Sequence, residues 1–255
     1  MSLEISFSPD RARAALLFAG PKGNLITEEL VGQLRRALVD LPESRHLKLV
    51  TLAGAGADFS FGASVPEHAP EHIARVLPDF HEVIDELMHL PMPTAAIVRG
   101  RCLGGGFELA LACDFILASD DATFGLPEIA LGVFPPVGSV LLPKRVGAAA
   151  ATSAVLTGAS RSAREWQQLG LVELVAPAAS LRAAVDAWFA RAIESRSAAA
   201  LRHAVMAVRG PMAEAVSREL PEMERLYLKE LMRTADAVEG IHAFMEKRLP
   251  RWEDR

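Results

Sequence analysis

Apolar residues in the first 135 positions fall into short runs separated by polar or turn residues. Five of these runs have the length and content typical of strands: residues 3–7, 12–18, 47–53, 94–98 and 114–119. Between the second and third runs, Leu30, Leu34 and Leu38 form one helical stripe, and Thr27 stands ahead of it as an N-cap. Strands that alternate with helices in this way predict an α/β fold.

Beyond about residue 146 the spacing is mostly helical, with one short strand expected at residues 172–176. The last helix carries apolar residues at helical spacing, a face that can pack on the core or on a neighbouring subunit: Val238, Ile241 and Phe244. We therefore expect a core formed by residues 1–195 and a helical region formed by residues 196–255.

Composition excludes several classes of function. The chain has 255 residues, of which 51% are hydrophobic, so it can bury a large core. Its 27 basic and 32 acidic residues are dispersed, and we expect no nucleic-acid partner. There is no basic leader followed by an apolar stretch and no apolar run near ~18 residues, which predicts a cytoplasmic protein without a membrane partner. Cys102 and Cys113 lack C-x-x-C spacing, so we expect reduced thiols and no metal site.

Two glutamates, Glu108 and Glu128, each beside a glycine-containing segment, are the strongest candidates for chemistry. A pair of carboxylates allows an enzyme to take a proton from water and to deliver another to carbon. Gly104, Gly105 and Gly106 run directly into a predicted helix, and residues without a Cβ let a ligand approach its first N–H groups. Such groups suit a developing oxyanion. Taken singly, each glutamate also fits an ordinary first helical turn.

Other motifs give weaker signals. Phe59 stands where a dinucleotide-binding loop would have its third glycine, and no lysine follows the glycine triplet at P-loop spacing. The serines of residues 60–64 lack the G-x-S-x-G elbow of serine hydrolases. His68 and His72 are separated by Pro70, which argues against a helical metal pair. Three polar residues share one helix face and predict a solvated stripe: His81, Asp85 and His89.

Considered together, four segments resemble the enoyl-CoA hydratase/isomerase, or crotonase, superfamily over essentially the whole chain. They are AGAGADFSFGAS (53–64), GRCLGGGFELALACDF (100–115), ATFGLPEIALGVFP (122–135) and EGIHAFMEKR (239–248). The resemblance implies an α/β fold, a crotonase-like spiral of ββα units followed by a C-terminal helical trimerisation region. It also implies an acyl-CoA thioester as substrate, no separate cofactor because coenzyme A is part of the substrate, and self-association as a homotrimer or a dimer of trimers.

In this family two backbone N–H groups hold the thioester oxygen, and by motif position these belong to Ala63, which follows Gly62, and Gly105, which follows Gly104. Hydratase members carry one glutamate in each of the two later blocks. Glu108 matches the first, to which the resemblance assigns deprotonation of water, and Glu128 matches the second, which would protonate the substrate carbon. Retention of both favours hydration over isomerisation, hydrolysis or decarboxylation on the same scaffold, and over a non-catalytic acyl-CoA-binding member.

Three more positions match residues that touch the nucleotide end of coenzyme A in the family: Lys22, Phe244 and Lys247. The last two would reach it from an adjacent subunit. An exposed lysine stem and a core aromatic account for these residue types equally well.

The chain also departs from the family pattern. Ser64 stands where hydratases commonly have aspartate, and Pro135 with Pro136 stands in place of a glycine-rich turn. A lost charge and a stiffened loop beside the acyl pocket suggest a substrate other than a short straight-chain enoyl group. The string FSFGASV followed by EH resembles hydratases that act on cyclohexa-1,5-diene-1-carbonyl-CoA.

Overall fold

The computed structural model describes residues 2–41, 44–69 and 72–255. Its main sheet has six strands in the order β1-β2-β3-β4-β6-β9, of which only the β1–β2 pair is antiparallel. Their bounds are β1 (Ser2–Phe7), β2 (Arg13–Ala19), β3 (Leu49–Gly54), β4 (Thr94–Val98), β6 (Phe115–Ser119) and β9 (Leu174–Ala176). All six strands predicted from the sequence are confirmed, with ends that differ by at most a few residues.

A smaller sheet extends the main one at the ends of two central strands. It contains β5 (Arg101–Leu103), β7 (Thr123–Gly125) and β8 (Arg161–Ser162). β4 continues into β5 and then into helix α4 (Gly105–Leu111), and β6 continues into β7 and then into the short 3-10 helix η3 (Pro127–Leu131). These repeated strand–strand–helix units confirm the fold class expected from the sequence.

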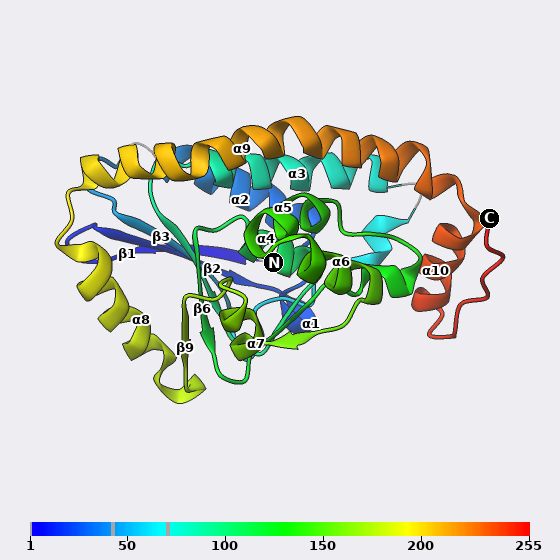
Figure 1. Cartoon of the computed structure of the whole chain (residues 1–255), viewed down its shortest axis with the longest axis horizontal. Coiled ribbons are helices and arrows are strands. Elements are labelled where there is room, and N and C mark those ends of the chain that lie inside the picture. Colours follow the sequence, from blue (N-terminus) through cyan, green and yellow to red (C-terminus); the bar gives the residue numbers. More distant parts are fainter. Residues whose placement is uncertain (1, 42–43, 70–71) are drawn as a thin grey trace.

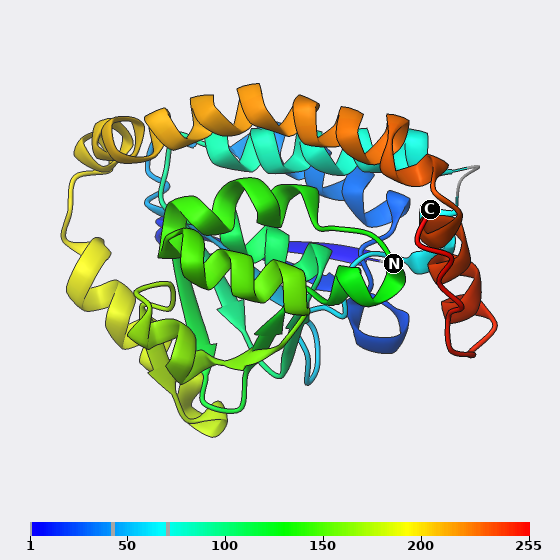
Figure 2. The same ribbon diagram turned by 45° about the vertical axis from the view of Figure 1, so that its right-hand side comes forward.

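Helices cover both faces of the main sheet (Figure 1). The long helix α9 (Ala198–Lys229) lies over α3 (Ile73–His89), which packs on α2 (Glu28–Asp40) (Figures 1 and 2). Helix α8 (Leu181–Phe189) lies on the opposite side against β6 and β9 (Figure 1). The remaining helices lie between these layers or beside them. Their bounds are α1 (Pro21–Asn24), α5 (Pro136–Val146), α6 (Ala148–Thr157), α7 (Ala163–Gln168) and α10 (Ala235–Met245).

Local sequence signals account for α2. The Thr27 side chain accepts a hydrogen bond from the Leu30 N–H at 3.3 Å, as expected of an N-cap. The predicted leucine stripe is buried in the core. No helix in the described parts of the chain is long and apolar enough to cross a membrane.

The solvated stripe predicted on α3 is wrong for one residue. His89 is exposed and Asp85 is partly exposed, but His81 is only 5% exposed and its Nδ1 lies 3.0 Å from Oε2 of Glu224 on α9. Helix α9 packs over this part of α3 and covers it. The division of the chain at residue 195, and a role of residues 196–255 in trimerisation, stay predictions.

Candidate active site

Two glycine segments lie side by side where β5 ends. The Leu103 N–H donates to the Ser60 carbonyl at 2.9 Å, which places residues 60–63 next to the start of α4. Gly62 has φ +97, and a Cβ there would lie 2.9 Å from the Leu103 carbonyl oxygen. Both the backbone conformation and the close approach therefore require glycine at this position.

Ala63 and Gly105 both line one pocket. A Cβ placed on Gly105 would lie 3.5 Å from Ala63 N, so the two backbone segments are immediate neighbours. Within the described residues, neither N–H has a hydrogen-bond acceptor. An oxygen atom of a ligand could accept from both, which is the geometry an oxyanion hole requires. Their role in holding a thioester stays a prediction.

Glu108 projects into the same pocket from the first turn of α4. The helix is anchored by Phe107, whose ring packs on those of Phe124 and Trp166 at 5.3 and 5.5 Å. Glu108 is 5% exposed, and its Oε1 accepts a hydrogen bond from the Gly138 N–H at 2.8 Å. Burial raises the pKa of Glu108 from 4.5 to about 7, although backbone N–H donors oppose this rise. Near neutral pH the group can therefore act as a base.

Glu128 approaches the same space from η3, directly after Pro127. A Cβ on Gly104 would lie only 2.7 Å from Oε1 of Glu128, so this glycine, with φ +50, leaves room for the carboxyl group. Burial, followed by the charge of Glu108, raises the pKa of Glu128 well above its usual range. Its Oε2 is buried and has no hydrogen-bond partner among the described residues. Two carboxyl groups with raised pKa values in one pocket suit the roles of base and acid, and those roles stay predictions.

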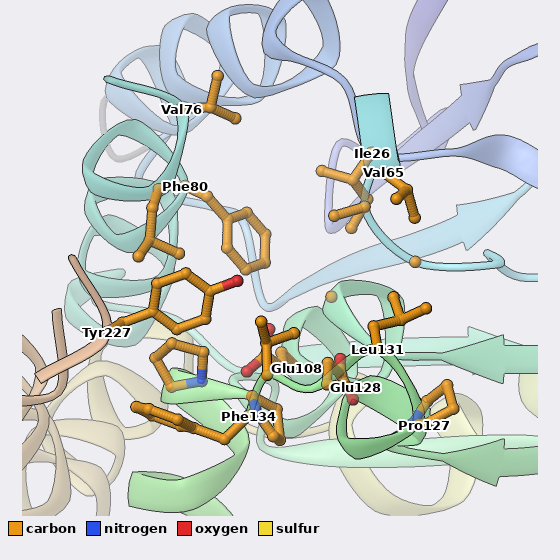
Figure 3. Close-up of a pocket in the computed structure, with 18 of the residues that line it drawn as sticks. Ile26, Val65, Val76, Phe80, Glu108, Pro127, Glu128, Leu131, Phe134 and Tyr227 are labelled. Atoms are coloured by element: carbon orange, nitrogen blue, oxygen red, sulfur yellow. The ribbon is translucent and has the colours of Figure 1, made fainter. Parts of the chain in front are cut away.

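The pocket is partly open to solvent, and its walls are mainly apolar (Figure 3). The side chains drawn around the glutamates include Ile26, Val65, Val76, Phe80, Leu131, Phe134 and Tyr227. Tyr227 was missed by the sequence reasoning. It lies in the last turn of α9, outside the four segments that resemble the family. The one signal in the sequence was that it is the sole tyrosine of the chain.

The structure brings most of the predicted site residues together. Glu108, Glu128, Ala63 and Gly105 line the pocket, and so do three of the predicted substrate-binding residues: Gly62, Gly104 and Pro135. Pro136, the first residue of α5, lines it as well.

Four predicted substrate-binding residues are not placed there. Ser64 is buried beside the pocket but is not one of its lining residues. Phe244 on α10 is 54% exposed, and neither it nor Lys247 reaches the pocket within one chain. The side chain of Lys22 lies outside the described part of the chain. Roles for these residues stay predictions.

No cluster of three or more histidine, cysteine, aspartate or glutamate residues is arranged to hold a metal ion in the portions of the chain described here. Cys102 and Cys113 are both buried and unpaired.

Comparison with known proteins identifies the class of protein that this fold and site define. The model of the family described as enoyl-CoA hydratase/isomerase matches residues 14–255, and the chain belongs to that family. A crystal structure of an enoyl-CoA hydratase from Mycobacterium avium subsp. paratuberculosis K-10 has a TM-score of 0.86 at 28% identity, covering 99% of this chain and 98% of the other.

Among relatives, cyclohexa-1,5-dienecarbonyl-CoA hydratase of Thauera aromatica is 41% identical over 256 residues, covering 99% of this chain and 97% of that protein. The 2,3-dehydroadipyl-CoA hydratase of Escherichia coli K12 is 34% identical over 234 residues, covering 91% of this chain and 89% of that protein. The family membership predicted from the four segments is confirmed. The expected enzyme class, a hydratase-type lyase, agrees with the activities for which these relatives are named.

Proposed function

We propose that the protein adds water to the C=C bond of an α,β-unsaturated acyl-CoA, and that its acyl group is a cyclic dienoyl ring. One observation carries the proposal: buried Glu108 and partly buried Glu128, both with raised pKa values, face an apolar pocket beside two unpaired N–H groups. Hydration needs a base for water, an acid for carbon and stabilisation of the intermediate enolate, and this arrangement supplies all three.

The thioester oxygen would accept hydrogen bonds from the N–H groups of Ala63 and Gly105, each contributing about 10²–10³ to the rate. Glu108 removes a proton from water as the oxygen forms a bond to carbon, and the π electrons move to the thioester oxygen. Glu128 then donates its proton to the carbon that carries the negative charge. Each transfer is expected to contribute about 10²–10⁴, and proton exchange between the two carboxyl groups restores the starting state.

The cyclic substrate is supported by the pocket walls and by the relatives. Pro135 and Pro136 give a rigid edge beside Glu108, and the opposing side chains are aliphatic or aromatic, which suits a flat hydrocarbon ring. The relative from Thauera aromatica, named for a cyclic dienoyl-CoA substrate, matches nearly the whole chain.

The proposal extends to the assembled protein. Coenzyme A enters as part of the substrate, with no separate cofactor. Residues 196–255 would join subunits into a homotrimer or a dimer of trimers, so that Phe244 and Lys247 lie near a neighbouring subunit's nucleotide site. Their exposure on one chain leaves them free for such a contact.

Mass spectrometry of the products in ¹⁸O-labelled water tests the reaction type directly. With cyclohexa-1,5-diene-1-carbonyl-CoA we expect an intact thioester that has gained one labelled water molecule. Free coenzyme A would indicate a hydrolase. A rearranged thioester of unchanged mass would indicate an isomerase. A decarboxylase would release carbon dioxide from a carboxylated acyl-CoA, which is assayed separately. Any of these, or binding without turnover, would contradict the proposal.

A further inference from the structure

Tyr227 is the sole tyrosine of the chain, and it forms part of the pocket wall. The residue is only 2% exposed. Its ring meets that of Phe134 edge to face, with centroids 5.5 Å apart, and it packs in a cluster with Ile73, Leu77 and Val133. These contacts hold the ring in one orientation, and this orientation determines where the hydroxyl lies.

Helices α3 and α9 are also joined next to the pocket. Glu224, one turn before Tyr227 on α9, contacts Nδ1 of His81 at 3.0 Å. The neighbour of His81 on α3, Phe80, lines the pocket beside Tyr227 (Figure 3). The His81–Glu224 contact therefore links the two helices close to the two aromatic side chains of the wall.

The hydroxyl of Tyr227 points into the pocket, on the side where Glu108 lies (Figure 3). Among the described residues that line the pocket, all side chains except those of Tyr227 and the two glutamates are apolar. No described residue forms a hydrogen bond with the hydroxyl, and its oxygen is not one of the fully buried side-chain atoms without a partner, so it stays accessible from the pocket. A partner is therefore expected from what enters the pocket.

Tyr227 is a donor under all ordinary conditions. Burial, then the charges of Glu128 and Glu108, raise the pKa of its hydroxyl above the usual value near 10, so it keeps its proton. The same influence shows that it lies within electrostatic reach of both carboxyl groups. When ionised, Glu108 only accepts hydrogen bonds, and Glu128 is expected to direct its proton at carbon. The oxygen being added would thus lack a donor without Tyr227.

We propose that Tyr227 is a specificity-determining residue whose hydroxyl donates a hydrogen bond to the oxygen that the acyl group gains on hydration. This inference rests on the proposed function and extends it to the recognition of one atom of the substrate. The contact holds the attacking water before the C–O bond forms and holds the product hydroxyl afterwards. An acyl group that carries no oxygen at this position gains nothing from it.

Binding of two unreactive thioesters tests the contact without turnover. 1-Fluorocyclohexanecarbonyl-CoA lacks the oxygen, and 1-fluoro-2-hydroxycyclohexanecarbonyl-CoA, with its stereoisomers measured separately, carries it on the carbon that water attacks. Fluorine replaces the α-hydrogen whose loss dehydration requires, so the hydroxy thioester cannot lose water. By isothermal titration calorimetry, Tyr227→Phe should bind the best hydroxy isomer about tenfold more weakly than the unaltered protein, while affinity for the thioester without the hydroxyl stays within about twofold. In hydration assays kcat should fall about tenfold, with KM for the unsaturated thioester little changed.

Ser217→Ala is the matched control. Ser217 lies on the same helix, and its hydroxyl donates a hydrogen bond to Asp85 outside the pocket. Removing this hydroxyl should leave the affinities for both thioesters unchanged. Tyr227→Leu removes ring and hydroxyl together, and should weaken both thioesters.

Equal effects of Tyr227→Phe on the two thioesters, or no effect on either, would overturn the contact. Because neither thioester reacts, this result is independent of hydratase activity. If the protein hydrates no enoyl thioester but Tyr227→Phe still weakens binding of the hydroxy thioester alone, the proposed function is wrong and the contact is supported.

Discussion

Replacing Glu108 by glutamine should make the protein more stable at alkaline pH, although it removes the proposed base. Burial raises the pKa of Glu108 from 4.5 to about 7 in the folded protein. The folded state therefore holds this proton more tightly than the unfolded chain does. The stability linked to it is complete below about pH 4.5 and is lost as the pH rises through about 7.

The magnitude follows from the size of the rise. Since one pKa unit corresponds to about 1.4 kcal/mol, ionisation of Glu108 costs about 3 kcal/mol of folding free energy at high pH, most of it between about pH 5 and 8.5. Glutamine keeps the shape and can accept the Gly138 N–H bond, but its buried NH₂ group needs a partner. We therefore expect a net gain of about 2 kcal/mol for Glu108→Gln over this pH interval.

Urea denaturation at about pH 5 and pH 8.5 measures this difference at matched protein concentration. In thermal melts, the difference in Tm between the variant and the unaltered protein should be roughly 4–8 °C more favourable to the variant at about pH 8.5 than at about pH 5. Glu214→Gln, which alters an exposed glutamate of α9, should show no such pH-dependent gain. If Glu108→Gln has the same stability relative to the unaltered protein at both pH values, the carboxyl group is not strained by burial and the reasoning fails.

Three further predictions concern turnover. Glu128→Gln should lower kcat by about 10² or more, with the affinity for a saturated acyl-CoA unchanged by calorimetry; full activity would remove Glu128 from the mechanism. Gly104→Ala should lose roughly tenfold or more in kcat, because φ +50 at this position strains a residue with a Cβ and the new Cβ would lie 2.7 Å from Oε1 of Glu128; a variant that is folded by circular dichroism and has normal kcat would refute this crowding. Because Glu108 must be ionised to accept a proton, kcat should rise as the pH passes through about 7, and a flat profile from about pH 5.5 to 8.5 would contradict that role.

Local sequence patterns predicted the elements that local forces determine. The strands at residues 94–98 and 114–119 were predicted nearly residue for residue, because parallel strands covered on both faces are almost continuously apolar. Thr27 was identified as a cap because its hydrogen bond reaches only three residues along the chain. Signals of this range need no knowledge of the tertiary structure.

Features that depend on distant residues could not be obtained this way. His81 is buried because Glu224, 143 residues later, covers it, and no periodicity on α3 indicates which helix will lie above that face. Tyr227 enters the pocket for the same reason, through the packing of α9 on α3. The neighbouring positions of Ala63 and Gly105 were expected only from the family resemblance. In the structure they follow from the hydrogen bond between Leu103 and Ser60.

Direct competition between a cyclic and a linear substrate tests the central claim most directly. In one reaction containing equal concentrations of cyclohexa-1,5-diene-1-carbonyl-CoA and crotonyl-CoA, the ratio of initial hydration rates equals the ratio of the two kcat/KM values. We predict at least a tenfold preference for the cyclic thioester, which requires about 1.4 kcal/mol of differential transition-state binding from the pocket walls. Equal or faster hydration of crotonyl-CoA would contradict the cyclic assignment, and no hydration of either thioester would contradict the assignment of hydratase activity itself.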